Sequence, residues 1–287
     1  MTTSHFPREA VLLLRPPYDR LVAVDPASPD QPFMGGWVMV WNLGSEAWSR
    51  ARHMVAHRPA GLPLAVILPE SDDHLSVLRV LKAIERSRPQ AVLPFHRTAR
   101  PREIASVIRR APASLATSVT EYLEWRGFAL DSVTRSVIYR TVELSSRVRT
   151  MSDLAKHLYM SRRAVGRRFR NSLLPVPSHW LHIGRVLRAT IRLQNSDATL
   201  FNIACSLGYP DGFSLSNQMR RLCGFRPQTV RDLIGWEWVF EGWIQREAAA
   251  GNVAPDVLDS RRPIAGLRPD TGDPGEAVAE AERAVSI

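Results

Sequence analysis

The sequence predicts an α/β domain followed by an all-α domain that holds two helix-turn-helix motifs joined by a long helix. Three observations lead to this fold class. Short, fully apolar runs alternate with helical segments before residue 111, which is typical of buried strands in an α/β domain. Two similar helix–turn–helix segments follow between residues 153 and 221. The positive charge of the chain is concentrated around the same two segments.

The first domain is predicted from its apolar runs. Strands are expected at four places: Val11–Leu14, Trp37–Trp41, Leu64–Leu68 and Ala91–Leu93. Helices are expected between them and after them: 46–57, from 72 onward, and 101–110. Strands that are apolar throughout belong to sheets covered on both faces, so we expect a parallel sheet in a three-layer sandwich.

The 287 residues predict about two domains. We place the α/β domain at residues 1–111, a helical connector at 112–147 and the helix-turn-helix domain at 148–235. From residue 250 to 287, Pro, Gly, Asp and Ala dominate and the apolar periodicity ends. We therefore predict a disordered tail there, with at most a short helix at 276–285.

The first helix-turn-helix unit begins with a short amphipathic helix that has three apolar residues on one face: Leu154, Ala155 and Leu158. Ser161 is a favourable N-cap for the second helix, because its hydroxyl accepts from amides of the next turn. Val165 and Phe169 are predicted to face inward. The outward positions are then mostly guanidinium groups: Arg162, Arg163, Gly166, Arg167 and Arg170. Such a face fits guanine edges or phosphates, although an isolated helix of this kind would be interpreted as a solvated basic face.

The second unit repeats this arrangement. Its lead helix has an apolar face, and Gly208 ends that helix in a left-handed cap. The next helix is predicted to turn three residues inward: Leu215, Met219 and Leu222. It turns five outward: Gly212, Phe213, Ser216, Asn217 and Arg220. Phe213 either contacts a thymine methyl group or packs on the neighbouring turn.

A helix over residues 179–194 is predicted to join the two units rigidly. On such a helix the two second helices can enter successive major grooves, about 34 Å apart. Residues 130–235 carry 17 Lys and Arg against 6 Asp and Glu, so the net charge of +10 of the whole chain resides there. This is the electrostatic pattern expected of a domain that binds double-stranded DNA.

Residues 148–232 resemble the DNA-binding domain of the AraC/XylS family, and the spacing of Gly208, Gly224, Pro227 and Arg231 is characteristic of it. Other residues carry the same resemblance: Leu154, Ala155, Ser161, Arg162, Val165, Phe169, Leu181, Arg185, Leu187, Ile203, Ala204, Tyr209 and Leu215. The resemblance implies a sequence-specific transcription regulator in the bacterial cytoplasm, associated with the nucleoid, with RNA polymerase as a partner.

The resemblance also implies roles for individual positions. Base-facing residues would be Arg163, Gly166 and Arg167 in the first unit, and Gly212, Phe213, Ser216 and Asn217 in the second. Phosphates would be held by Arg162, Arg170, Arg220 and Arg221. The chain departs from the family pattern at four positions: Leu174, Leu215, Asn217 and Met219. Three of them lie in the second unit, which would bind weakly or mainly grip the backbone.

The end of the first domain, with a strand at Ala91–Leu93 and a helix from Pro101, resembles the end of a response-regulator receiver. The expected strand ends carry neither an acceptor Asp nor a Lys. We therefore expect a degenerate, non-phosphorylated receiver-like domain that forms a homodimer or contacts another protein. An alternative is a signal-responsive domain that binds a small molecule or accepts a phosphoryl group.

Other chemistry is weakly indicated. His53 and His57 lie four residues apart, a metal-binding spacing, but a surface pair is the better interpretation, and His179 and His182 are expected to pack or cap. Cys205 and Cys223 are expected to be buried, reduced thiols. No nucleophile–base pattern, phosphate loop or signal peptide is present, so we expect no enzyme activity, no cofactor, no metal, no membrane association and a cytoplasmic location.

Overall fold

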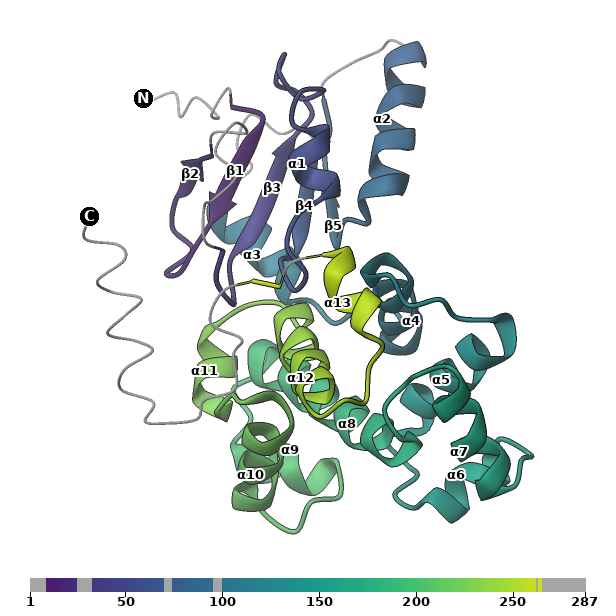
Figure 1. Cartoon of the computed structure of the whole chain (residues 1–287). Helices are drawn as coiled ribbons and strands as arrows, with labels where there is room; N and C mark the ends of the chain where they lie inside the picture. The colour runs from purple at the N-terminus through teal and green to yellow at the C-terminus, as the bar shows by residue number, and fades with distance from the viewer. Residues whose placement is uncertain (1–8, 25–32, 70–73, 95–99, 262, 265–287) are drawn as a thin grey trace.

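The computed structural model describes residues 9–24, 33–69, 74–94, 100–261 and 263–264. Its first part is a five-stranded sheet in the order β2-β1-β3-β4-β5 (Figure 1). The strands are β1 Val11–Leu14, β2 Leu21–Ala23, β3 Val38–Asn42, β4 Leu64–Ile67 and β5 Ala91–Leu93. Four of these match the predicted apolar runs, and β2 was not predicted.

The sheet is mixed, so the prediction of a parallel sheet is wrong for the edge that contains β1 and β2. Strand β1 pairs antiparallel with both neighbours, with Leu13 opposite Val22 and Leu12 opposite Val40. Strands β3, β4 and β5 are parallel. Apolar runs report that both faces are buried but not strand direction, and this left the direction of β1 open. The receiver-like assignment is not confirmed.

Helices cover both faces of the sheet. Helix α3 (Pro101–Arg109) packs on one face, where Ile104 and Ile108 meet Leu12, Val40 and other alternate strand residues. Helices α1 (Arg52–Ala56) and α2 (His74–Ser87) lie on the opposite face. The predicted helix 46–57 is therefore shorter than expected, because residues 46–51 form turns instead.

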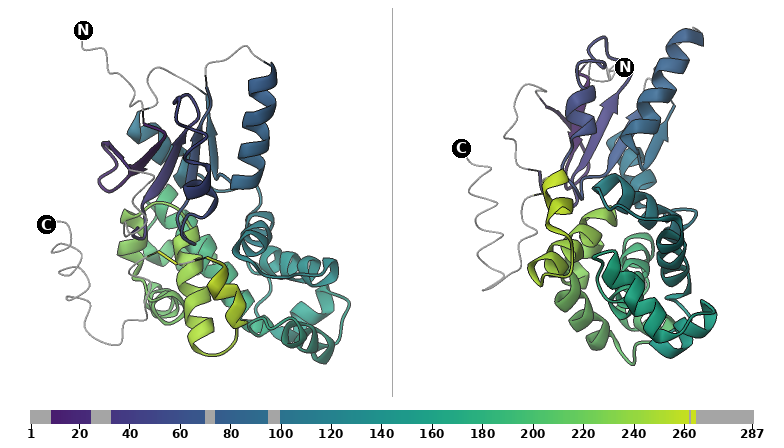
Figure 2. Two further views of the ribbon diagram at one scale, coloured as in Figure 1. Left: turned by 45° about the horizontal axis from the view of Figure 1, so that its top comes forward. Right: turned by 45° about the vertical axis from the view of Figure 1, so that its right-hand side comes forward.

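The second part of the chain is helical and lies beyond one end of the sheet (Figure 2). Its first two helices are α4 (Leu115–Arg126) and α5 (Ser132–Leu144). The remaining helices are α6 Met151–His157, α7 Arg162–Asn171, α8 Pro177–Asn195, α9 Leu200–Ser206, α10 Gly212–Cys223, α11 Pro227–Asp232, α12 Glu237–Ala249 and α13 Pro255–Ser260. The boundaries predicted near residues 111 and 147 stay predictions.

The disordered tail does not begin at residue 250. Helix α13 follows there, its Val257 is buried, and Ile264 is 2% exposed beside the sheet domain. The segment that forms α13 has too few regularly spaced apolar residues for the sequence to predict a helix there. Residues 265–287, including the short helix predicted at 276–285, lie outside the described residues. Within the described part of the chain, every helix is too short or too polar to cross a bilayer.

Candidate nucleic-acid interface

Helices α6 and α7 form a capped pair joined by a tight turn. The Thr150 hydroxyl accepts from the Asp153 amide at 3.1 Å to begin α6. The Ser161 hydroxyl accepts from the Ala164 amide at 3.1 Å to begin α7, as the sequence predicted. Between them Tyr159 adopts a positive φ of 53°, which turns the chain sharply. The Ser161 cap fixes where α7 starts and therefore which of its residues face outward.

The apolar side of α7 anchors it to the long helix α8. Val165 and Phe169 are fully buried, and the Phe169 ring meets Trp180 of α8 edge-on, with ring centroids 6.2 Å apart. The residues predicted to face outward do so: Arg162, Arg163, Arg167 and Arg170 are exposed. A Cβ built on Gly166 would meet nothing within 4 Å, so the middle of this face is open to a close approach by another backbone or a base edge.

Charge on α7 is divided between two sides. Arg168 turns toward α5, where its guanidinium lies 3.4 Å from the Asp131 carboxylate. Hydrogen bonds from the Thr134 side chain and amide lower the pKa of Asp131, so this carboxylate stays ionised. The four outward arginines have no ion-pair partner among the described residues. Unpaired guanidinium groups in this density favour binding to a polyanion.

Helices α9 and α10 form the second capped pair. Thr199 caps α9 by accepting from the Asn202 amide at 3.2 Å, and Asp211 caps α10 by accepting from the Ser214 amide at 2.7 Å. Gly208 closes α9 with φ +79°, as expected of a left-handed cap. The buried face of α10 consists of Leu215, Met219 and Cys223. Leu222, predicted inward, is only half-buried.

The outward face of α10 combines polar and apolar groups. Phe213 is 74% exposed, so it does not pack on the neighbouring turn, which was one of its two interpretations. Gly212, Ser216 and Asn217 are half-buried around it, and Arg220 and Arg221 are exposed. The Arg221 guanidinium donates to the Gln218 side-chain oxygen at 3.0 Å. This face is less basic than that of α7, as expected.

Helix α8 connects the two pairs. Its 19 residues span about 28 Å at 1.5 Å per residue. The pairs α6–α7 and α9–α10 lie toward opposite ends of α8, on the side of the molecule away from the sheet (Figures 1 and 2). The Arg185 guanidinium of α8 lies 5.5 Å from the Tyr209 ring centre, and Gln194 donates to three carbonyls near α11. Helix α8 is therefore held both at the turn between α9 and α10 and at the end of α11.

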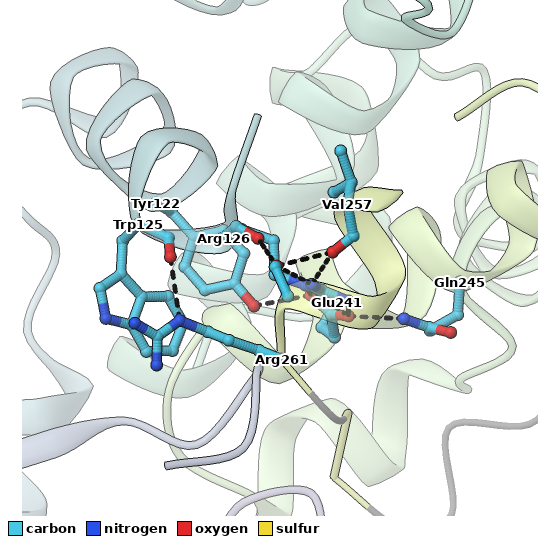
Figure 3. A network of polar contacts seen from close by, with 8 residues as sticks. Tyr122, Trp125, Arg126, Glu241, Gln245, Val257 and Arg261 are labelled. Carbon is cyan, nitrogen blue, oxygen red and sulfur yellow. Dashed lines mark hydrogen bonds and ion pairs between the residues drawn. The ribbon is translucent and has the colours of Figure 1, made fainter. Parts of the chain in front are cut away.

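A buried polar network joins the helical domain to the connector and α13 (Figure 3). Both side chains of the ion pair between Arg126 of α4 and Glu241 of α12 are 0% exposed, with 3.2 Å between Nη2 and Oε1. The Tyr122 hydroxyl donates to Glu241 at 2.7 Å, and Arg126 also donates to the Val257 carbonyl of α13. Burial and the nearby Glu241 raise the pKa of Tyr122. This network holds α4, α12 and α13 in one arrangement.

Other predicted groups fall outside this interface. The rings of His53 in α1 and His57 at its C-cap stack 4.1 Å apart, and His179 pairs with Glu247 at 2.8 Å. The described residues contain no group of three metal-binding side chains. Cys223 is buried as predicted, whereas Cys205 is exposed, because α9 turns Ile203, Ala204 and Leu207 inward instead.

The sequence analysis missed Tyr159. This residue is 96% exposed in the turn that precedes α7. Hydrophobic periodicity ignores turn residues, so no pattern marked it. Its positive φ, which is uncommon for a bulky aromatic residue, is visible only in the structure.

A family model described as "Helix-turn-helix domain" matches residues 154–232. No curated protein matches the chain significantly.

Three solved structures are similar to parts of the chain. One is a transcriptional regulator with an AraC-type DNA-binding domain from Chromobacterium violaceum, at 24% identity over 35% of this chain and 94% of that one, with a TM-score of 0.32. Another is the DNA-binding domain of the global transcriptional factor AdpA in complex with a target DNA, at 32% identity over 33% and 86%, with a TM-score of 0.30. The xylose-binding transcription activator xylR shares 10% identity over 67% and 60%, with a TM-score of 0.36.

Proposed function

With an AraC-type helix-turn-helix domain at residues 154–232 as the premise, we propose that the protein is a sequence-specific transcription regulator that binds double-stranded DNA through α7 and α10. The observation that carries this proposal is the exposed, unpaired guanidinium face of α7, a helix that Ser161 caps and that Val165 and Phe169 anchor by burial. A recognition helix needs this combination, because the face must be free for DNA while the helix is held by its other side.

The two faces divide the work of binding. Arg163 and Arg167 read base edges, since a guanidinium donates two parallel hydrogen bonds to guanine. Arg162 and Arg170 hold phosphates at the flanks of α7. Arg220 and Arg221 do the same on α10, where Phe213 supplies an apolar contact for a thymine methyl group.

Both helices bind one face of the duplex in adjacent major grooves. This finer proposal is supported by their placement toward opposite ends of the 19-residue α8. We propose RNA polymerase as a further partner, from the kind of regulator that the domain indicates. A homodimer through the α/β domain is supported by exposed apolar residues on α2 and β5: Leu78, Leu81 and Val92.

The test compares three arginines of α7. Arg167→Ala is expected to weaken binding to a selected specific site by about 1–3 kcal/mol, with little change on random DNA. Arg170→Ala is expected to weaken binding to specific and random DNA equally. It should also reduce the slope of log affinity against log salt concentration by about the value of one phosphate contact. Arg168→Ala removes a guanidinium from the same helix but from its inward side, and it is the matched control.

Fluorescence anisotropy with the full chain at several salt concentrations measures all three variants. Equal losses on specific and random DNA for Arg167→Ala would refute a reading role for α7. A loss for Arg168→Ala as large as that for Arg167→Ala would show that charge alone, and not the outward face, determines binding.

A further inference from the structure

A cleft of about 440 Å³ lies between α1 and α2, on the sheet face opposite α3. Its volume falls in the range of about 300–1,000 Å³ that small-molecule sites occupy. The inner wall is apolar and consists of Trp41 of β3, Val55 of α1 and Ala83 of α2. The Trp41 indole N–H already donates to the Trp48 carbonyl at 3.2 Å, so the wall offers the cleft no free donor from this ring.

The rim of the cleft is cationic. Arg52 comes from α1, Lys82 and Arg86 come from α2, and His53 completes the rim. Among the residues that the structure describes, no acidic residue lines the cleft, and none of the three cations has an ion-pair partner. Cations scattered on a surface are usually only solvated. Here cations from two helices line one apolar hollow, and an anion bound there is attracted by all three of them.

We propose that this cleft binds a small organic anion, a carboxylate on an apolar body. The body lies against Trp41, Val55 and Ala83, and the carboxylate lies at the rim between Lys82 and Arg86. An apolar wall with a few convergent polar groups is the usual composition of a small-molecule site. Because the rim is positively charged, the ligand is expected to carry a negative charge.

A larger cleft of about 890 Å³ near α3 fits such a ligand less well. Asp197 contributes a carboxylate to its lining. The Arg231 guanidinium there is already occupied, because it donates to the carbonyls of Ser196 and Ala198. The cleft between α1 and α2 has neither feature.

The proposed site lies next to the contacts that join the two domains. Ala56 lines the cleft, and its carbonyl accepts from Arg261, which follows α13. Ser87 lines it too, and its carbonyl accepts from the buried Arg58 at 2.6 Å. The next residue, Arg88, pairs with Glu237 of α12 at 2.5 Å. A ligand that changes the spacing of α1 and α2 would therefore shift residues that contact α12 and the segment after α13. That such a shift regulates DNA binding rests on the proposed function.

Isothermal titration calorimetry on the full chain without DNA tests the site. The probes are octanoate and 2-naphthoate, with octan-1-ol for the apolar body alone and acetate for the charge alone. We expect at least one of the two larger carboxylates to bind saturably with a Kd of about 1 mM or below. Octan-1-ol and acetate should bind at least about tenfold more weakly, since each lacks one of the two contacts.

The variants separate the cleft from general charge. The double variant Lys82→Gln/Arg86→Gln should bind the carboxylate at least about tenfold more weakly. Ala83→Leu should abolish binding by filling the cleft. Arg50→Gln removes an exposed cation that does not line the cleft and should bind like the original protein. Thermal unfolding midpoints confirm that each variant is folded.

Three results would overturn the proposal: no saturable binding of either carboxylate, unchanged binding in the double variant, or equal affinity for octan-1-ol and octanoate. Because DNA is absent from these titrations, their outcome does not depend on the anisotropy measurements. Loss of DNA binding by itself would refute the proposed function and leave the anion site intact.

Discussion

The buried pair between Arg126 and Glu241 makes Glu241→Gln the most informative stability variant. Arg126 directs three contacts of 3.2 Å to the two carboxylate oxygens, and the Tyr122 hydroxyl adds one at 2.7 Å. Both charged side chains are 0% exposed. Gln keeps the size of the side chain but removes its charge, and it replaces one acceptor oxygen by an NH₂ donor that faces other donors.

The expected cost follows from what remains around Arg126. Its guanidinium keeps neutral partners, the Val257 carbonyl and the Ser260 hydroxyl, but no counter-charge in contact. Removing one partner of a buried ion pair costs about 3–5 kcal/mol. Domains are typically stable by only about 5–15 kcal/mol, so Glu241→Gln is expected to remove roughly a fifth or more of the stability of the chain.

Urea denaturation of the full chain, followed by tryptophan fluorescence and circular dichroism, measures this loss. The matched control is the double variant Arg126→Met/Glu241→Leu, which leaves no buried charge and should be less destabilised than Glu241→Gln. A loss below about 1 kcal/mol for Glu241→Gln, or a double variant that is less stable than the single one, would refute the reasoning that charge pairing in this network determines stability.

Two further predictions concern individual titratable groups. Burial and the neighbouring Arg185 lower the pKa of His182 to about 4. As the pH drops from about 6.5 to 4, the unfolded chain therefore takes up the proton before the folded chain does, and the free energy of unfolding should fall. After allowance for the partial exposure of His182, the loss is about 1–2 kcal/mol. Urea titrations at several pH values should show this acid-dependent part missing in His182→Gln, and an unchanged pH profile would contradict it. Cys205 is exposed, whereas burial raises the pKa of the Cys223 thiol, so a thiol reagent at pH 8 should modify one cysteine quickly and the second only on unfolding; two fast thiols, or a Cys205→Ser variant that still reacts quickly, would contradict this placement.

Local signals in the sequence were sufficient for the candidate interface. Ser161 marked the start of α7, and the four-residue spacing of Val165 and Phe169 identified its inner side, so the outward arginines followed by elimination. Caps and helical periodicity act within one or two turns, and a single sequence contains all the residues that they require. The same reasoning located α8 to within two residues at its start and one at its end.

Contacts between distant residues decided the rest. The direction of β1, the docking of α13 and the pairing of Arg126 with Glu241, 115 residues apart, depend on which surfaces meet after the elements form. The cleft between α1 and α2 also belongs to this group, because its wall and rim come from three separate segments. The sequence by itself determined the starts and the apolar sides of the helices around the candidate interface, from α7 to α10, since these follow from neighbours along the chain. Only the tertiary structure decided how the two domains join, because burial free energy depends on partners that no local pattern identifies.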